Sequence, residues 1–561
     1  MTWRALAVGS ALGILIVTSN LYMGLKTGWW EAGALTASIL GFCVLSSTGR
    51  RAELLETNII QTIAASMGAM PATMGFLGAI PALSLMGYHY SPWAIGAWGC
   101  ALGGFGVAIG LLLKRKLLYE EGLPFPTAIA TAELIAAMHS FRREALARGK
   151  AFIAGGAAAA LIVWLRDASR LIPQASFFPL TWFGIAPQTL NLGLSWSPLL
   201  AGAGVLVGLR SAASLLAGAA VAWGFIAPWL LRSGIVTEHR YSALVGWLVF
   251  PGVAMVLGAA ATSLPAAANG LFRKLKDLSL KNLVKFGESQ FSATQALLVL
   301  LAIVVIVVLG RTVFACPPGA VLFALILSVI LASVASRAAG QTDIVPLGKI
   351  GRITQLLFGV LAPGSAVINT VAGSVVAGDA AQTASVLYAL QAGRKLAASP
   401  RQQIRAQLGG VLLGALVSVP IYVLFVKTYG LGSLELPVPS AVEWKAVAET
   451  VSRGMSGPPP LAARAASFGF AAGVALTMLS RTRWSKFFPV SAAAGLAFIV
   501  PAHYSATIFL GAALLAIAKF RNSRRVDVDT YRSAVGGGAI AGESLMGVLI
   551  AVLMAFRLLP S

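Results

Sequence analysis

The stretch TNIIQTIAASMGAMPATMGFLGAIPALSLMGYHYSPWAIGAWGCALGGFGVAIGLLL, from Thr57 to Leu113, contains no Asp, Glu, Lys or Arg. A helix needs about 20 consecutive apolar residues to cross a bilayer, so this stretch is long enough for two or more crossings. Comparable uncharged runs lie on both sides of it, including Ala5–Leu25, Ala32–Gly49, Leu171–Leu209, Tyr241–Phe272, Thr312–Ser336, Ile353–Gly378, Ala406–Val426 and Phe487–Ala518. The sequence therefore predicts an all-α polytopic membrane protein with about 14–16 transmembrane helices.

The composition of the 561-residue chain supports this prediction. Hydrophobic residues make up 58% of it and charged residues only 11%, whereas about 25% of a soluble domain is charged. The 42 Lys and Arg and the 19 Asp and Glu are too few to cover the surface of several soluble domains. This arithmetic excludes a soluble enzyme, a secreted disulfide scaffold and a disordered protein.

The basic residues give a net charge of +23 and stand in short clusters between the apolar runs, such as Lys114–Lys116 and Arg394–Arg405. This pattern follows the positive-inside rule and does not form the basic patch of a nucleic-acid-binding protein. We therefore expect a multi-pass protein of the inner or plasma membrane, with the basic loops in the cytoplasm. The Pro-rich loop Lys427–Pro460, which carries Glu435 and Glu443, is expected outside the cell.

Several motifs recur in the same order along the chain. Ser19-Asn20, Lys26 and Gly28 recur as Thr342-Asp343, Lys349 and Gly351; Gln61-Thr62 as Gln382-Thr383; Phe125-Pro126 as Phe488-Pro489; and Gly287-Glu288-Ser289 as Gly542-Glu543-Ser544. We interpret this as two repeated transmembrane halves, residues 1–310 and 311–561, with extra helices at about 150–272 in the first. Duplicated halves with a binding site at their interface are typical of transporters.

Ionisable and amide side chains inside apolar segments are the candidate functional residues, because polar groups are costly to place in lipid. Glu133 follows Pro124 and Pro126 in a short segment with basic residues on both sides, which predicts a broken or re-entrant helix. Pro501 interrupts the corresponding second-half segment. His139 and His503 also correspond in the repeat, and we expect both near the membrane interface. For each acid, a structural hydrogen bond or a helix-end position is the alternative interpretation.

The motifs of common enzymes and cofactor sites are absent. GLKTG at Gly24–Gly28 lacks the spacing of a P-loop, HExxH does not occur, and Met546 stands where a nucleophile elbow needs its second glycine. Cys43, Cys100 and Cys316 have no disulfide or zinc spacing. We predict no enzyme activity, no catalytic residue, no cofactor and no protein-bound metal.

The motifs together resemble those of the oligopeptide transporter family, and most closely its shorter prokaryotic members, related to the yellow-stripe-like metal-chelate branch. The resemblance runs nearly end to end. It rests on SNLYMGLKTGW (Ser19–Trp29), ETNIIQTIAASMG (Glu56–Gly68), LPFPTAIATAEL (Leu123–Leu134), GQTDIVPLGKIGRITQL (Gly340–Leu356), GRKLAASPRQQIRAQLGG (Gly393–Gly410) and AGESLMGVL (Ala541–Leu549). Within DAAQTASVLYALQAGRKL, Asp379 is the only acid where relatives often carry an acidic or Met-rich run, which leaves substrate and coupling ion open.

The resemblance implies a proton-driven secondary transporter with about 16 helices that carries oligopeptides or metal–chelate complexes by alternating access. The proton would be carried by Glu56, Glu133, Asp379 or Glu543. The substrate would be bound by Asn20, Tyr22, Lys26, Asn58, Gln61, Lys349, Asn369 and Gln382. Lys26 and Lys349 would meet substrate carboxylates or only snorkel to the interface. The alternatives are a channel, a metal-ion carrier and a membrane-embedded lipid enzyme, and an oligomer is compatible with the sequence.

Overall fold

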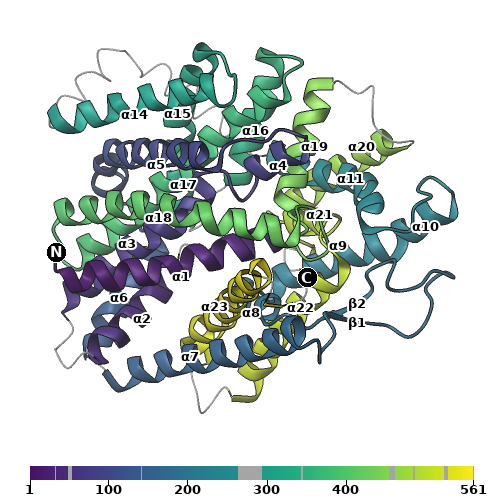
Figure 1. Ribbon diagram of the computed structural model, residues 1–561, viewed down its shortest axis with the longest axis horizontal. Helices are drawn as coiled ribbons and strands as arrows, with labels where there is room; N and C mark the ends of the chain where they lie inside the picture. The colour runs from purple at the N-terminus through teal and green to yellow at the C-terminus, as the bar shows by residue number, and fades with distance from the viewer. Residues whose placement is uncertain are drawn as a thin grey trace. The chain divides into compact units, whose positions relative to one another are not determined.

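The computed structural model describes residues 1–31, 33–47, 53–140, 142–262, 293–342, 345, 347–453, 461–483, 487–522, 528–556 and 558–559. Helices dominate this part of the chain, and a short antiparallel hairpin is its one named sheet (Figure 1). The predicted all-α architecture is therefore confirmed.

Ten helices within the described residues are long and apolar enough to cross a membrane. They are Trp3–Thr27, Pro92–Glu120, Leu146–Ala168, Leu209–Arg232, Tyr241–Ala259, Pro318–Gln341, Pro400–Tyr429, Ala462–Leu479, Ala502–Arg521 and Tyr531–Met554. Four shorter apolar helices accompany them, at Ala34–Ser47, Pro198–Val207, Val299–Thr312 and Ile350–Leu361. The chain is thus a multi-pass membrane protein.

Contacts divide the chain into two compact units. Unit 1 holds residues 1–21, 30–147 and 265–423, and unit 2 holds residues 22–29, 148–264 and 424–561. This division follows contacts, whereas the predicted halves follow internal repetition, so the halves stay a prediction. Of the repeated motifs, Gly287–Ser289 and Asp343 lie outside the described residues.

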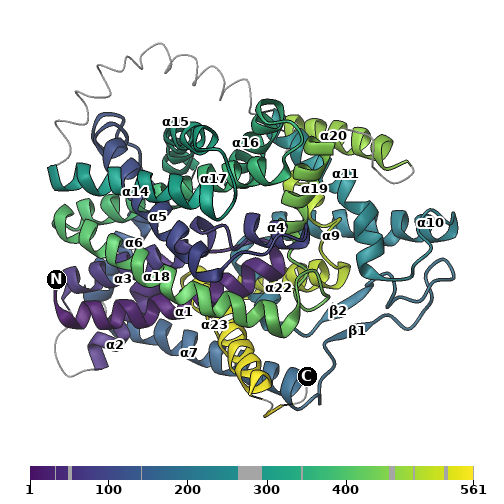
Figure 2. The same ribbon diagram turned by 45° about the horizontal axis from the view of Figure 1, so that its top comes forward.

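Unit 1 is built around the long helix α17. Its elements are α1 (Trp3–Thr27, up to residue 21), α2 (Ala34–Ser47), α3 (Leu54–Thr73), α4 (Ala79–Leu85), α5 (Pro92–Lys114), the π-helical turn η1 (Arg115–Glu120), α6 (Pro126–Ser140), α14 (Ala293–Thr312), α15 (Pro318–Thr342), α16 (Leu347–Leu361), α17 (Ala366–Lys395) and α18 (Pro400–Tyr429, up to residue 423). Helices α3, α5, α15 and α16 all pack on α17, and its neighbours α15 and α16 can be followed in Figure 2. Gly106 and Gly110 of α5 face α17 and permit a close approach there.

Unit 2 contains a pair of closely packed helices, α11 and α20. Its elements are α7 (Arg142–Val163, from residue 148), the π-helical turn η2 (Trp164–Ala168), β1 (Ala175–Phe177), β2 (Gly193–Ser195), α8 (Pro198–Val207), α9 (Leu209–Ala219), the π-helical turn η3 (Ala220–Ile226), α10 (Ala227–Arg232), α11 (Tyr241–Ala261), α19 (Pro439–Arg453), α20 (Ala462–Leu479), α21 (Ser491–Leu496), α22 (Ala502–Asn522) and α23 (Val528–Ala555). The ends of α1 and α18 also belong to it.

The run Leu171–Leu209 does not form the transmembrane helix that its lack of charge predicts. It forms the β1–β2 hairpin, in which Ala175 pairs with Ser195, followed by α8. Pro173, Pro179 and Pro187 lie in this run, and proline lacks the N–H that a helix interior needs. The prediction was wrong here because these prolines prevent a continuous helix over the run.

Broken helices occur at both positions where the sequence predicts them. Phe125 has a φ of 48°, which changes the direction of the chain, and helix α6 begins at the next residue, Pro126. Helix α6 is only 15 residues long. In unit 2, α21 stops at Leu496 and α22 begins after Pro501. Short helices of this kind place helix ends inside the protein, where backbone groups can meet a ligand.

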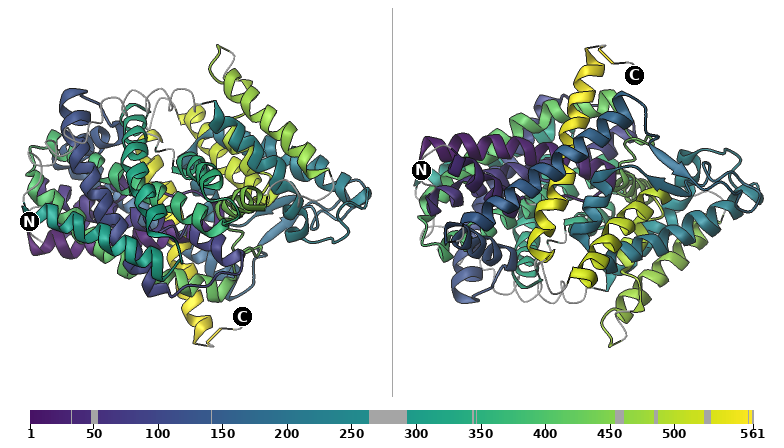
Figure 3. Two further views of the ribbon diagram at one scale, coloured as in Figure 1. Left: turned by 90° about the horizontal axis from the view of Figure 1, so that it is seen from above. Right: turned by 90° about the horizontal axis from the view of Figure 1, so that it is seen from below.

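The crossing of α7 and α23 depends on glycine. A Cβ atom at Gly538 would lie 2.4 Å from the carbonyl oxygen of Phe152, and one at Gly542 would lie 2.1 Å from that of Gly156. Neither distance can accommodate a side chain, so the two backbones are in direct contact. Figure 3 shows α7 in blue and α23 in yellow passing each other.

We expect Gly538→Ala to destabilise unit 2 by about 1–3 kcal/mol, because the added methyl group forces the two helices apart. The melting temperature of the detergent-solubilised protein measures this effect. Gly246→Ala is the matched control, since a Cβ there meets no atom within 4 Å. Equal melting temperatures for the two variants would contradict the close crossing.

Candidate functional site

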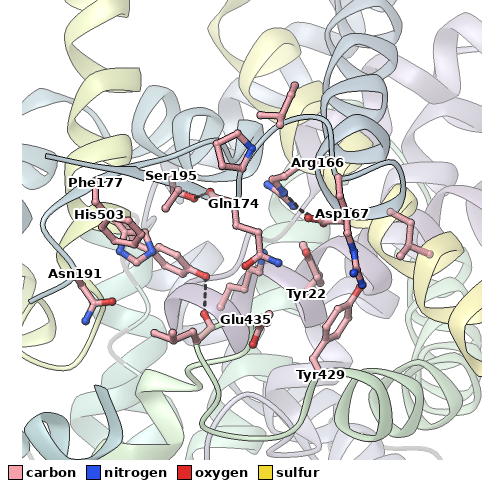
Figure 4. A pocket seen from close by; sticks show the side chains of 18 of the residues that line it. Tyr22, Arg166, Asp167, Gln174, Phe177, Asn191, Ser195, Tyr429, Glu435 and His503 are labelled. Carbon is pink, nitrogen blue, oxygen red and sulfur yellow. Dashed lines mark hydrogen bonds and ion pairs between the residues drawn. The ribbon is translucent and has the colours of Figure 1, made fainter. Parts of the chain in front are cut away.

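A cavity of about 840 Å³ lies within unit 2. Its wall is formed by the end of α1, the η2 turn, the β1–β2 hairpin, the segment after α18, the start of α22 and the end of α23. Figure 4 shows Arg166 and Asp167 on one side of the cavity and Phe177, Asn191 and His503 on the other, with Gln174 between them. Volumes of this order are typical of small-molecule sites.

Lys26 reaches the cavity from the last turn of α1. The helix ends there because Gly28, with a φ of 76°, takes the left-handed conformation and donates its N–H to the carbonyl of Gly24 at 2.8 Å. Val438 then donates its N–H to the carbonyl of Leu25 at 2.9 Å, which fixes this turn to the segment before α19. The Lys26 side chain is 9% exposed and lines the cavity.

The carboxylate of Glu543, on α23, is fully buried beside Lys26. Its Oε1 lies 3.5 Å from Lys26 Nζ and 3.3 Å from Arg166 Nη2. Its Oε2 accepts a hydrogen bond from the Ser197 hydroxyl and one from the Leu199 N–H, both at 2.8 Å. Because Ser197 is the N-cap of α8, the carboxylate stands at a helix N-terminus, which favours negative charge. Two cations and two neutral donors thus stabilise the charge of Glu543.

Arg166 is held in place by three different groups. It lies in the η2 turn, and its Nε and Nη2 both donate to the Asp167 carboxylate at 2.6 Å. Its Nη1 donates to the carbonyl of Trp196 at 2.8 Å, just before α8. With its contact to Glu543, the guanidinium joins η2, α8 and α23. Paired Arg–carboxylate geometry of this type is strong and directional.

Aromatic rings form the floor beside Lys26. The ammonium lies 4.6 Å from the centre of the Tyr22 ring, a cation–π contact. Tyr22 is buried and packs on Phe425 at 5.2 Å and near Tyr429 at 6.3 Å between ring centres. Gly547 of α23 leaves room for the Tyr22 ring, since a Cβ there would lie 3.1 Å from it.

The cavity offers both signs of charge to a ligand. Among the described residues, the Lys26 ammonium has one ion pair, with Glu543 at 3.5 Å, and the cation–π contact with Tyr22, so N–H donors remain available. Glu435 is exposed, lines the cavity and forms no hydrogen bond or ion pair with described residues. A ligand that carries a carboxylate and an amine would find partners for both.

Three of the predicted site residues, Tyr22, Lys26 and Glu543, are therefore brought together in unit 2. The remaining ones belong to unit 1. Lys349 is part of α16, but its side chain lies outside the described part of the structure.

The predicted amides of unit 1 are buried, but they are not gathered into one group. Asn20 donates to the carbonyls of Gly68 and Glu31 and accepts from the Glu31 N–H, so it joins three segments. Gln382 donates to Ser66 at 3.0 Å and accepts from Thr73 at 3.4 Å. These contacts support the alternative interpretation of such residues, in which they form structural hydrogen bonds.

The contacts of Gln382 also reveal that α3 and α17 run antiparallel. Ser66 lies near Gln382, while Thr73, further along α3, faces Gly378, which comes earlier on α17. Asn58 and Asn369 consequently belong to opposite ends of this helix pair. Each has a buried side-chain N–H group with no hydrogen-bond partner, although the Asn58 carbonyl oxygen accepts from Gln61 at 3.1 Å.

The three acids of unit 1 have different surroundings. Glu56 is buried, accepts a hydrogen bond from Thr2 and lies 3.7 Å from Arg4. Glu133 is exposed on α6. Asp379 is fully buried on α17, where its Oδ2 accepts a hydrogen bond from Ser328 at 2.6 Å and its Oδ1 has no partner.

Sequence reasoning missed Arg166, Asp167 and His503 as site residues. Arg166 and Asp167 stand at the end of an apolar run, the usual place for residues that only reach the interface. His503 is buried in the cavity wall. The π-helical turn at Arg166 and the break at Pro501 are the local signals that point to them.

A polytopic fold that encloses a charged cavity is the arrangement of a membrane transporter. The chain belongs to the oligopeptide transporter family, because the family model described as OPT oligopeptide transporter protein matches residues 1–554. It is therefore a transporter and not an enzyme, and the resemblance of its motifs is confirmed. Among the described residues, no group of three His, Cys, Asp or Glu could hold a metal ion.

Relatives of two kinds match almost the whole chain. A putative oligopeptide transporter of Saccharomyces cerevisiae is 22% identical over 98% of this chain and 95% of its own length. One of Haemophilus influenzae is 24% identical over 95% of this chain and 92% of its own length. A probable metal-nicotianamine transporter of Oryza sativa is 21% identical over 100% of this chain and 88% of its own length.

We expect Glu543→Gln to destabilise the protein by about 3–5 kcal/mol, because it leaves Lys26 and Arg166 without their shared buried carboxylate. Thermal unfolding in detergent measures the loss. Glu435→Gln removes an exposed, unpaired carboxylate and is the control, with little change expected. Similar unfolding temperatures for both variants would refute the stabilising role of Glu543.

Proposed function

We propose that this protein is a secondary active transporter of the cell membrane that carries short peptides or peptide-like metal chelates. The relatives whose names specify oligopeptides or metal–nicotianamine support both ligand types. In this proposal the substrate binds in the unit 2 cavity, and the protein exposes it alternately to the two sides of the membrane.

The available ammonium of Lys26 is the single observation that carries the proposal. It is a positive charge, nearly buried, with unused N–H donors on the wall of a cavity of about 840 Å³. A buried cation in a membrane protein is expensive unless it has a function or a full set of partners. A carboxylate of a peptide or chelate would complete its hydrogen bonds.

Proton coupling is the finer part of the proposal, and Asp379 is its best-supported carrier. Glu543 has two cations beside it and Glu56 has one, whereas the structure gives Asp379 only the Ser328 hydroxyl. A buried carboxyl group without a counter-charge favours its protonated form. Uptake and release of a proton there would change its hydrogen bonding without breaking an ion network.

We expect Lys26→Gln to raise the KM for a tripeptide with a free carboxyl group by about 10- to 100-fold, the loss of one charged hydrogen bond. Uptake of labelled tri-alanine into proteoliposomes under an imposed pH gradient measures this. The same tripeptide with an amidated carboxyl terminus should be transported equally by wild type and variant.

Lys427→Gln is the matched control for that experiment, because Lys427 is exposed and does not line the cavity. If Lys26→Gln affected the acid and the amide equally, carboxylate binding by Lys26 would be refuted. Saturable counterflow of labelled substrate would further separate a carrier from a channel, which shows uncoupled flux.

We expect Asp379→Asn to abolish accumulation driven by the pH gradient while substrate exchange across the membrane continues. The amide keeps the shape of the carboxyl group but cannot carry a proton. Paired uptake and exchange assays in proteoliposomes distinguish the two activities. Glu133→Gln is the comparison: loss of accumulation in that variant alone would identify Glu133 as the carrier instead.

A further inference from the structure

A second hollow of unit 2 is a groove of about 570 Å³ whose walls are formed mainly by α8, α22 and α23. Helix α8 packs closely on both α22 and α23, whereas these two helices have few contacts with each other. A Cβ atom at Gly511 of α22 would lie 2.0 Å from the carbonyl oxygen of Ala201. One at Gly202 would lie 2.8 Å from that of Gly536 of α23. Because α8 has only 10 residues, about 15 Å of helix, it cannot fill the space between two membrane-spanning helices along their whole length.

The walls of the groove are apolar and open to the surface of the protein. Leu510 and Leu514 of α22 and Val535 of α23 line it, and Leu514 is 55% exposed and Val535 46%. Both helices contain membrane spans, so these side chains meet hydrocarbon. On α22 the groove extends from Thr507 to Ala518, about 16 Å of helix. This length is close to the hydrocarbon depth of one leaflet, which is half of about 30 Å.

One end of the groove is basic. Tyr531, the first residue of the last membrane span, and Arg532 line the groove there, and tyrosine is favoured at membrane interfaces. Ala518 is followed on α22 by Lys519 and Arg521, and residues 519–532 contain five Lys or Arg against two Asp. No Asp or Glu is among the described residues that line the groove. This end is therefore complementary to an anionic group.

Arg532 is positioned by the end of α8 and keeps an available donor. Its Nε donates to the carbonyl of Val205 at 2.9 Å, and its Nη2 donates to that of Leu206. Both carbonyls lie at the C-terminal end of α8, where the helix dipole favours a cation. Among the described residues, Nη1 has no hydrogen-bond partner and the guanidinium has no carboxylate beside it. A phosphate group would supply both the acceptor and the counter-charge.

We propose that this groove binds an anionic phospholipid, with the phosphate on Arg532 and one acyl chain along the apolar wall of α22. The positive-inside rule places the basic end at the cytoplasmic leaflet, where anionic lipids are found. Basic pockets between membrane helices on that side are suited to such headgroups. The lipid is a bound component of the protein and not the transported molecule, so the site does not depend on what the protein carries.

The lipid would support the wall of the charged cavity. It would pack on α8, whose first residues donate hydrogen bonds to Glu543 from the Ser197 hydroxyl and the Leu199 N–H. Ser195, just before α8, lines both the groove and the cavity. A lipid that holds α8 in place therefore also stabilises the position of the Glu543 carboxylate.

Native mass spectrometry of the delipidated protein, titrated with phosphatidylglycerol, measures the dissociation constant of the lipid. We expect the wild type to bind phosphatidylglycerol about tenfold more tightly than phosphatidylcholine, whose choline offsets the phosphate charge. Arg532→Gln should weaken phosphatidylglycerol binding about 10- to 100-fold, the loss of a charged hydrogen bond. Arg521→Gln is the matched control and should stay within about threefold of wild type, because Arg521 is an exposed member of the same basic cluster that does not line the groove.

Two further measurements test the apolar part of the site. Ala518→Trp fills the groove and leaves Arg532 in place, and it should weaken phosphatidylglycerol binding about tenfold. In the wild-type protein, phosphatidylglycerol with a photoactivatable group on its acyl chain should label residues of α22 and α23 that line the groove. Mass spectrometry of the labelled peptides locates the attachment, and this measurement does not require any variant to fold.

Four results would overturn the inference. Equal weakening by Arg532→Gln and Arg521→Gln would show only a general attraction between a basic surface and anionic lipid. Unchanged binding in Ala518→Trp, or labelling outside the groove, would remove the acyl chain from it. Glycerol phosphate that competes as well as the whole lipid would make the ligand a free anion. A lipid-free dimer in the mass spectrum that Ala518→Trp dissociates would assign the groove to a second copy of the chain.

Discussion

Neutralisation of one buried carboxylate, that of Glu543, is the interaction on which unit 2 depends. Its partners are Lys26 at the end of α1, Arg166 in η2 and the N-terminus of α8. Removing charges from water costs several kcal/mol per ion unless each finds partners of the right sign and geometry. The elements that supply those partners are far apart in the sequence, so the charge balance constrains where each of them ends. The glycine contacts between α23 and α7 support this charge balance, because they let α23 come close enough for Glu543 to reach both Lys26 and Arg166.

The same network gives its two cations different properties. Arg166 uses its guanidinium on Asp167, Trp196 and Glu543 and has little left to offer a ligand. Lys26 has one longer ion pair, with Glu543, and a cation–π contact with the Tyr22 ring, and it borders the cavity. One cation therefore holds the structure while the other can exchange partners. A ligand carboxylate that binds Lys26 would draw on a charge that the fold has already desolvated, and a desolvated site strengthens electrostatic binding.

Hydropathy predicted most of the helices, because a bilayer allows few other structures in an uncharged run of sufficient length. It failed at Leu171–Leu209, where prolines prevent a continuous helix and the chain forms the hairpin that lines the cavity. The cost of ionisable groups in lipid drew attention to Lys26 and Glu543, which the fold brings to within 3.5 Å of each other. It could not reveal Arg166, whose place beside the cavity depends on a long-range contact: Glu543 lies 377 residues from Arg166 in the sequence. Glu133 shows the converse, because a suggestive motif surrounds a side chain that is exposed.

The contrast between Glu543 and Asp379 gives the two units different parts in the proposed mechanism. If Glu543 took up a proton, the two cations beside it would lose their counter-charge. Each transport cycle would then have to disrupt the network that shapes the cavity. Asp379 has a serine hydroxyl for one oxygen and nothing for the other, so a proton can come and go with only a local change in hydrogen bonding. A transporter that binds charged substrates benefits from keeping these tasks apart, because substrate charge then does not compete with the driving proton for one carboxylate. We infer that substrate recognition belongs to unit 2 and proton binding to unit 1.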